Sequence, residues 1–320
     1  MEFRKAVDVP KRTIGFFLEQ GGSGDFICYS AAIDYVARKY DYVEGIVSAP
    51  AHMVGFVSNV LRKHDNWKVI PEALKRETIA PGTIVKVPSI RPINATMMHL
   101  LELGFLYYAE INPIPDNERF YPELDLGNTK LHGAVLSKNY AVMVPGSTCP
   151  SRTMTPKTFN EVKNYLIGVG IKPVFLGNDK MRVGKGEKYT NFNSQYDLTG
   201  GINLLNKTSI MEAAKIIEHS RLIVGIDNGL LHLAACTRAP IVFGYTIAGP
   251  KQRRPVRRCE APIIDVVVTK DELSCIHCQE EMRYFENNFK HCLYKDYKCL
   301  DLLNADKFIE GIRSALYITY

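Results

Sequence analysis

Short apolar segments alternate with segments of helical periodicity along most of the chain. In its first part, runs of strand length and stretches of helix length follow one another in turn. The strands are expected at residues 13–18, 45–48, 68–70 and 84–87, and the helices at 26–40, 52–63 and 94–108. This alternation is typical of βαβ units, in which helices cover the faces of a parallel sheet.

The pattern breaks between residues 111 and 138, where three prolines and mixed charge leave no regular period. Such a composition is typical of an interdomain connection. A second alternating series follows, with strands expected at 140–144, 172–176, 221–225 and 240–243 and a last helix at 305–317. The sequence therefore predicts an α/β protein of two Rossmann-like domains, residues 1–135 and 136–320, with a ligand cleft at the carboxyl ends of the strands.

Size and composition fit such a protein. The chain has 320 residues, of which 46% are hydrophobic and 23% charged, as in ordinary soluble proteins. Its first residues are charged and lack an apolar signal core, and no apolar run is long enough to span a membrane. A cytoplasmic protein is therefore expected. Its formal net charge of +6 favours an anionic partner, such as nucleotide phosphates, a phosphorylated glycolipid or nucleic acid.

A glycine-rich turn, GGSGDF at residues 21–26, joins the first expected strand to the first helix. Gly22 and Gly24 allow a tight turn and leave helix amides free to face an anion, so they are candidates for binding a phosphate or the acceptor. The spacing differs from G-x-G-x-x-G, which disfavours a dinucleotide. Asp25 is an N-cap candidate, and capping alone would explain its type. Its place at a strand end also allows a catalytic role.

A polar loop, VPGSTCPSRTMTPKTF at residues 144–159, follows the first strand of the second series. The hydroxyls of Ser147 and Thr148 and the guanidinium of Arg152 suit a phosphate group, because arginine can donate two parallel hydrogen bonds to it. An ordinary βα loop with Pro156 in the first turn of the next helix would have the same composition. The loop is thus a candidate phosphate-binding site with a structural alternative.

A third group of polar residues, Asp227-Asn228-Gly229, ends a strand, and His232 lies one turn inside the helix that follows. Gly229 lets a ligand approach the helix N-terminus, whose amides and partial positive charge favour a pyrophosphate. A lone histidine in a buried helix is more often a structural donor than a catalyst. The density of polar residues here nevertheless favours a binding site for a diphosphate, with Asp227, Asn228, Gly229 and His232 as its candidate ligands.

Half of the eight cysteines cluster near the C-terminus, in the order Cys275, Cys278, Cys292 and Cys299. Four thiolates can hold Zn or an iron centre in a tetrahedral site, with His277 and His291 as substitute ligands. Six residues separate the second pair, so the spacing does not match a zinc ribbon. A structural metal and a metal-free cluster both stay open, and neither would take part in the chemistry.

A basic run, KQRRPVRR at residues 251–258, is expected in a loop because of its prolines. Arg253 and Arg254 in this run are candidates for contacts with phosphate groups of a lipid or nucleic-acid acceptor. A solvated loop is the more common explanation of such a run.

With these motifs the chain resembles the heptosyltransferase-like glycosyltransferases of family 9, which act in lipopolysaccharide-core synthesis. The resemblance is strongest over residues 141–246. It is carried by GGSGDF, GSTCPSRTMTPKTF, DLTGG at 197–201 and DNGLLHLAA at 227–235. The last of these corresponds to the family pattern D-x-G-x-x-H-L-A-A. Many members also have a similar cysteine cluster.

The resemblance implies a GT-B fold, in which two Rossmann-like domains face each other across a cleft, with the C-terminal helix as a candidate to cross back. It implies an inverting enzyme that moves a hexosyl, pentosyl or heptosyl group from a nucleotide-diphosphate sugar to a saccharide or glycolipid hydroxyl, with no cofactor required. Asp25 matches the proposed general base. The donor site that it implies consists of Ser147, Thr148, Arg152, Asp227, Gly229 and His232.

The chain departs from the family around this donor site. Arg152 stands where the family usually has lysine, and Met154-Thr155 replaces its Trp-Pro. Heptose on lipopolysaccharide is therefore one option among several. The alternatives are a glycosyltransferase for protein or for DNA with hydroxymethyl-pyrimidines, and a non-catalytic protein of the same fold that binds nucleotide sugars or nucleic acid. No Asp-x-Asp motif occurs in the chain, so a metal-chelating donor site is not supported.

Overall fold

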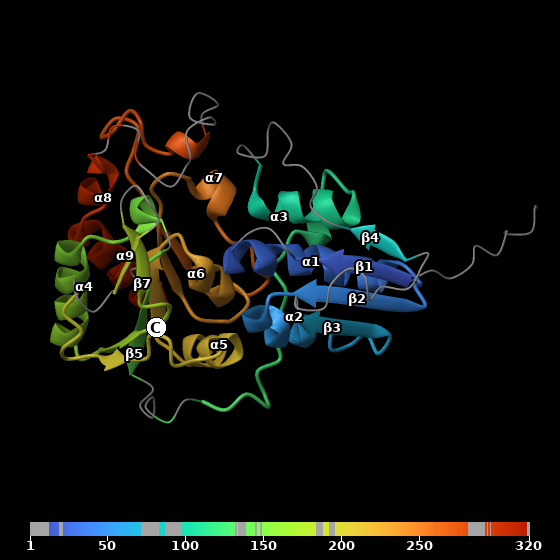
Figure 1. Cartoon of the computed structure of the whole chain (residues 1–320). Helices are drawn as coiled ribbons and strands as arrows, with labels where there is room; N and C mark the ends of the chain where they lie inside the picture. Colours follow the sequence, from blue (N-terminus) through green and yellow to red (C-terminus); the bar gives the residue numbers. More distant parts are fainter. Residues whose placement is uncertain are drawn as a thin grey trace, which may run out of the picture.

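The structure is a computed structural model. It describes residues 13–18, 22–71, 83–86, 98–131, 133, 139–144, 146–147, 149–183, 188–191, 196–280, 292, 294 and 296–318. Within these residues the strands form two parallel sheets, each accompanied by helices, and one antiparallel pair (Figure 1).

The first sheet is parallel throughout, with the strand order β3-β2-β1-β4. Its strands are β1 (Thr13–Phe17), β2 (Glu44–Ala49), β3 (Trp67–Pro71) and β4 (Ile84–Lys86). Strand β1 is buried along almost its whole length, which explains its uninterrupted apolar sequence. Helix α1 (Ser23–Lys39) follows β1 directly and buries an apolar face that includes Phe26, Ile27 and Ile33.

The second sheet is also parallel, with the order β12-β11-β10-β5-β6-β9. Its strands are β5 (Tyr140–Val144), β6 (Lys172–Phe175), β9 (Ile202–Asn203), β10 (Leu222–Ile226), β11 (Ile241–Gly244) and β12 (Ile263–Val266). The chain builds outward from β5 through β6 to β9, then returns to β10 on the other side of β5. This is the strand order of a doubly wound nucleotide-binding sheet, whose switch point lies between β5 and β10.

Further helices surround the two sheets (Figure 1). They are α2 (Val54–Val60), α3 (Leu100–Gly104), α4 (Pro156–Gly168), α5 (Ile210–Glu218), α6 (Gly229–Ala234), α7 (Pro250–Arg253), α8 (Lys298–Leu302) and α9 (Ala305–Ile318). The antiparallel pair consists of β7 (Lys180–Val183) and β8 (Lys188–Asn191), which the apolar pattern did not predict. Among the described residues, no helix combines the length and the apolar character needed to cross a membrane.

Most expected elements are present, with shifted ends. Helix α1 begins at Ser23 instead of residue 26. The helix expected at 52–63 is a 3-10 turn, Ala51–Met53, followed by α2. The described part of the helix expected at 94–108 is α3, which continues as a π-helix over Phe105–Ala109. The observed helix ends differ from the predicted ones because the apolar periodicity identifies the residues of a buried face but not the capping residues at which a helix begins and ends.

The expected interdomain connection is irregular, as predicted, but it is packed against the rest of the protein. Over residues 111–131 the structure describes only a 3-10 turn, Asp116–Glu118, as regular structure. Ile114 and Tyr121 are nonetheless buried, and the Tyr121 N–H donates to the Val256 carbonyl at 2.8 Å. The boundary between residues 135 and 136 lies outside the described residues and stays a prediction.

One continuous apolar core joins the first sheet and α1 to the face of the second sheet that α5 and α6 cover. A second core fills the opposite face, under α4 and α9. Helix α9 buries Phe308, Ile312 and Ala315 in this second core, against β11 and β12. Over its described length α9 therefore packs on the second sheet. The expectation that it crosses back to the first domain is wrong, because its apolar face is buried against the second sheet.

Candidate active site

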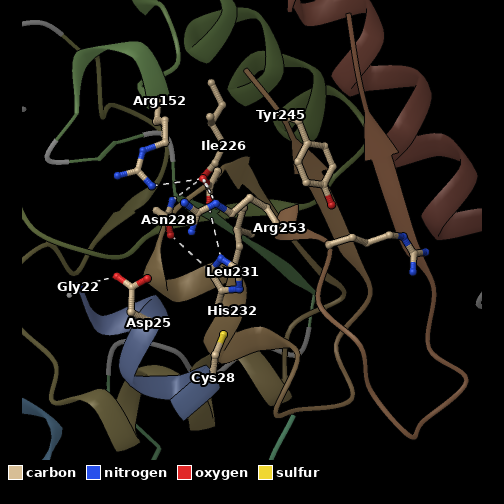
Figure 2. Close-up of polar contacts among 12 residues, drawn as sticks. Gly22, Asp25, Cys28, Arg152, Ile226, Asn228, Leu231, His232, Tyr245 and Arg253 are labelled. Carbon is tan, nitrogen blue, oxygen red and sulfur yellow. Dashed lines mark hydrogen bonds and ion pairs between the residues drawn. The ribbon is translucent and has the colours of Figure 1, made fainter. Parts of the chain in front are cut away.

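Three loops at the carboxyl ends of parallel strands meet between the two sheets. They connect β1 to α1, β5 to α4 and β10 to α6. Ligands of doubly wound sheets bind at this edge, beside the switch point. Figure 2 shows the side chains that the loops bring together, with Asp25 on α1 facing Arg152 and Asn228 of the second half.

Asp25 lies in the first turn of α1, where its carboxylate Oδ2 accepts a hydrogen bond from the Gly22 N–H at 2.7 Å (Figure 2). Gly22, and not Asp25, is the N-cap residue. Asp25 thus supports the helix start from the third helical position, which corrects the N-cap assignment. Asp25 itself is half-buried. Burial lowers the pKa of the Arg152 guanidinium, but the charge of Asp227 and, to a smaller extent, that of Asp25 raise it. Capping and catalysis are therefore compatible roles for this residue.

Asp227 follows directly after β10, and its buried carboxylate has three partners. Its Oδ2 lies 3.2 Å from Arg152 Nη1 and 3.8 Å from Arg253 Nε, and its Oδ1 lies 3.3 Å from His232 Nε2. Burial alone would raise the pKa of this carboxyl group. The charges of Arg152 and Arg253 and the hydrogen bond with His232 outweigh burial and hold the pKa well below its usual range.

The positive charge of this cluster exceeds its negative charge, since two guanidinium groups share one carboxylate. Arg152 keeps about a quarter of its side chain exposed, at 26%, whereas Asp227 is only 2% exposed. The Arg152 guanidinium is therefore held by Asp227, while the side chain stays partly exposed. Such an arrangement can bind an anionic group.

Asn228 is the N-cap of α6 and joins the ends of two strands. Its Oδ1 accepts the N–H groups of Leu230 and Leu231 at 2.9 and 3.3 Å, and its Nδ2 donates to the carbonyls of Val144 and Ile226 at 3.2 and 2.8 Å. The side chain is thus occupied within the protein. The amides of Leu230 and Leu231 are occupied as well, so a diphosphate would have to find other donors in the cleft.

Gly24 and Gly229 allow helices α1 and α6 to approach each other closely. A Cβ atom on Gly24 would lie 2.9 Å from His232 Cδ2, and one on Gly229 would lie 3.0 Å from Ser23 Cβ and 3.1 Å from the Gly24 nitrogen. Both distances are too short for a real Cβ atom without displacement of the neighbours. The structure therefore explains these glycines by helix packing across the two halves, whereas the sequence explained them by ligand approach.

The loop after β5 has internal hydrogen bonds and a partly exposed arginine, Arg152. The Ser147 N–H donates to Thr153 Oγ1 at 3.3 Å, and Ser147 Oγ accepts the Cys149 N–H at 3.2 Å. Thr148 lies outside the described residues. Helix α4 then begins with Thr155 as N-cap and Pro156 in its first turn. Of the predicted phosphate ligands in this loop, Arg152 is the charged one, and its Nη1 lies 3.2 Å from Asp227 Oδ2 (Figure 2).

Several cations of the basic run at residues 251–258 have partners within the protein. Arg253 pairs with Asp227, and Arg254 Nε lies 2.9 Å from Asp265 Oδ2. The Arg257 guanidinium donates to main-chain carbonyls, at 2.8 Å in the case of Ala239. A patch that contacts nucleic acid needs cations that are free to meet phosphates. Nothing in this arrangement favours DNA as the acceptor.

The four clustered cysteines line one cavity of about 230 Å³, together with Ser151 and Thr246 of the loops beside the site. Burial, and to a lesser extent the other three cysteines, raises the pKa of the Cys299 thiol to about 12. Among the described side chains, no three histidine, cysteine or acidic groups are already gathered as a metal site. His277 packs against Gly249, and His291 lies outside the described residues.

Two residues of the site could not be found from the sequence. Tyr121, in the irregular segment between the sheets, lies with its Oη 2.9 Å from His232 Nδ1. Cys28, one turn after Asp25 on α1, donates from Sγ to the same oxygen at 3.0 Å. No periodicity or motif marks either residue, because each is defined by partners far along the chain.

Solved structures share this fold. The chain is similar to the iron-containing dodecameric glycosyltransferase TibC from enterotoxigenic E. coli H10407, with 14% identity and a TM-score of 0.74 over 97% of this chain and 77% of that one. A family 9 glycosyl transferase from Veillonella parvula matches with 13% identity and a TM-score of 0.63, covering 96% of this chain and 97% of that one. The E. coli ADP-heptose lps heptosyltransferase II matches with 15% identity and a TM-score of 0.59, covering 96% and 99%. Likeness at such low identity shows the fold alone, which is the GT-B fold.

Residues 109–286, more than half of the chain, match the model of glycosyltransferase family 9 (heptosyltransferase), and the chain belongs to this family. It is therefore a nucleotide-sugar glycosyltransferase. The predicted resemblance to this family is thereby confirmed. None of the curated proteins matches the chain in sequence.

Proposed function

We propose that this glycosyltransferase moves a sugar, with inversion, from a nucleotide-diphosphate sugar to a hydroxyl group of a saccharide or glycolipid. The observation that carries the proposal is the position of the Asp25 carboxylate on α1, across from the positively charged Arg152–Asp227–Arg253 cluster of the second half (Figure 2). A base on one side of a cleft and a diphosphate ligand on the other are what a single displacement requires.

In this mechanism the acceptor hydroxyl attacks the anomeric carbon from the side of Asp25, which takes the hydroxyl proton. The bond between that carbon and the diphosphate oxygen breaks on the opposite side, and its electron pair leaves with the nucleoside diphosphate. Arg152 stabilises the negative charge that develops on this leaving group. Because one displacement occurs, the configuration at the anomeric carbon inverts.

ADP-heptose is the first donor to test, since the chain belongs to a family described as heptosyltransferases and TibC was solved in complex with ADP-D-β-D-heptose. An anionic glycolipid or saccharide fits the excess of positive charge in the cleft. A cytoplasmic location, where nucleotide sugars are available to such an enzyme, remains our prediction for the compartment.

Donor binding should raise the melting temperature of the purified protein. A ligand at one hundred times its Kd stabilises the folded state by roughly 2.7 kcal/mol. We expect a clear shift with one class among ADP-, UDP-, GDP- and CDP-sugars, and a much smaller shift in Arg152→Ala. Arg313→Ala, which removes a guanidinium from α9, serves as the matched control and should keep the shift. If none of the four nucleotide classes shifts the wild-type protein, the proposed donor site is wrong.

We propose further that Cys275, Cys278, Cys292 and Cys299 hold a structural iron or zinc ion. Their common cavity supports this, because soft thiolate ligands suit both metals. TibC, which has the same fold, is described as iron-containing. The ion would draw the thiols together and fix the C-terminal segment against Thr246, next to the loop that carries Arg253.

Metal analysis of the purified protein tests this assignment. We expect about one iron or zinc ion per chain, as in a four-thiolate structural site. The double variant Cys275→Ser/Cys278→Ser should lose the ion and melt at a lower temperature. Cys259→Ser changes a cysteine outside the cavity and should keep the ion. Wild-type protein that carries neither metal would show that the cluster is metal-free.

A further inference from the structure

A chain of buried hydrogen bonds connects the helix of Asp25 to the carboxylate of Asp227. Cys28 Sγ lies 3.0 Å from Tyr121 Oη, which lies 2.9 Å from His232 Nδ1. His232 Nε2 in turn lies 3.3 Å from Asp227 Oδ1. Cys28 is fully buried, and the other three residues are each only 2% exposed. Water is therefore kept away from all four groups.

The protons along this chain have one consistent arrangement. The carboxylate of Asp227 can only accept, so His232 Nε2 must carry a hydrogen. Burial raises the pKa of the Cys28 thiol and of the Tyr121 phenol, so both groups keep their protons. Cys28 then donates to Tyr121, and Tyr121 donates to Nδ1 of His232. The imidazole is consequently neutral, with its hydrogen on Nε2.

We propose that Tyr121 is a positioning residue for sugar transfer: its hydroxyl, which donates to Nδ1, holds the imidazole ring of His232 in place, and His232 in turn orients Asp227 and the Arg152 guanidinium bound to it. The inference rests on the proposed function, because it assigns Arg152 to the donor side of the cleft. Both ring nitrogens of His232 are occupied. The histidine therefore supports Asp227 and is not the general base.

The position of Tyr121 allows it to serve both sides of the cleft. Its ring stacks on that of His232, with 5.9 Å between centroids and an interplanar angle of 22°. Its backbone N–H is bound to the Val256 carbonyl at 2.8 Å, close to α7 and Arg253. Its hydroxyl also receives the hydrogen bond of Cys28, from the helix that carries Asp25. One hydroxyl group thus fixes the base-carrying helix relative to the donor cluster.

Replacing Tyr121 by Phe removes only the hydroxyl. Nδ1 of His232 then faces a buried ring without a donor, so the imidazole keeps its hydrogen on Nε2 but loses the contact that fixes the ring. A less fixed imidazole holds Asp227 less firmly, and Arg152 loses part of the fixed position that Asp227 gives it.

Nitrogen-15 NMR of the imidazole groups reads the tautomer in the full-length protein without donor or acceptor. Signals of His232 are identified by their loss in His232→Gln. Wild-type protein should show a protonated Nε2 and an unprotonated, hydrogen-bonded Nδ1. These signals should shift in Tyr121→Phe. They should stay in place in Tyr140→Phe, which loses an equally buried hydroxyl bond, to the Ile216 carbonyl at 2.6 Å.

In the transfer assay, Tyr121→Phe should lower kcat/KM for the donor about 10-fold, in line with one buried group left unsatisfied. Tyr140→Phe should match the wild type. A wild-type His232 that carries its hydrogen on Nδ1, or on both nitrogens, overturns the proposal even if the variant fails to fold. Unchanged His232 signals or an unchanged kcat/KM in folded Tyr121→Phe overturn it too. Because the tautomer is measured without substrates, its result is independent of whether the proposed function holds.

Discussion

Asp25→Asn is expected to lower kcat by about 10²- to 10⁴-fold, the range that a general base contributes. The asparagine side chain keeps the size of aspartate and still offers an oxygen to the Gly22 N–H, so the start of α1 should persist. It cannot take a proton from the acceptor hydroxyl. Donor affinity, which we attribute to Arg152 and its neighbours, should stay close to that of the wild type. Steady-state kinetics and a donor titration on the same preparation separate the two effects.

Asp306→Asn provides the matched control for Asp25. Asp306 also lies in the first turn of a helix, α9, but is exposed and far from the cleft. Both substitutions remove one negative charge near a helix N-terminus, so a helix effect would appear in both variants. We expect full activity in Asp306→Asn. Equal activity in Asp25→Asn and wild type would show that another group takes the proton, or that the chain only binds sugars.

Asp227→Asn should have the largest effect on stability, a loss of about 3–5 kcal/mol in the free energy of unfolding, because it removes one partner of a buried ion cluster. Arg152 and Arg253 would then share a buried site without a counter-ion. Donor binding should weaken as well, since Arg152 loses its anchor. Chemical denaturation measures the first effect and a donor titration the second. A loss of unfolding free energy as small as that of a surface substitution would contradict the role assigned to Asp227.

The same variant has a defined pH dependence. The folded-state pKa of Asp227 is lowered, so its contribution is complete above the unfolded-state pKa of about 3.9 and is lost as the pH falls towards the folded-state value. The stability difference between Asp227→Asn and wild type should be constant from about pH 8 to about pH 5 and narrow below about pH 4. A stability difference that narrows near neutral pH would mean that a titratable group other than Asp227 is responsible.

The polar strand ends could be predicted because their signals are local. An apolar run that stops at Asp227-Asn228-Gly229 marks the end of a strand, and the rule for parallel sheets places that end beside the ligand site. The same reasoning placed Asp25 after the first strand of the first series and Arg152 after the first strand of the second. It needed only the alternation of strands and helices, which the structure has in nearly the predicted places.

Contacts between distant segments could not be predicted. Tyr121 and His232 are 111 positions apart, and the segment of Tyr121 has no period that would place it. The basic run suggested free cations, but the turn at α7 directs Arg253 to Asp227. The packing of Gly24 against α6 likewise depends on how the two sheets are placed. In each case the residue type follows from a tertiary contact that no local pattern encodes.

A crystal structure of the protein with the nucleotide sugar that raises its melting temperature most would test the central claim most directly. Our account predicts that the diphosphate contacts the Arg152 guanidinium and that the anomeric carbon faces the Asp25 carboxylate, with the sugar between the two sheets. A diphosphate bound away from Arg152, or a sugar whose anomeric carbon faces away from Asp25, would contradict it.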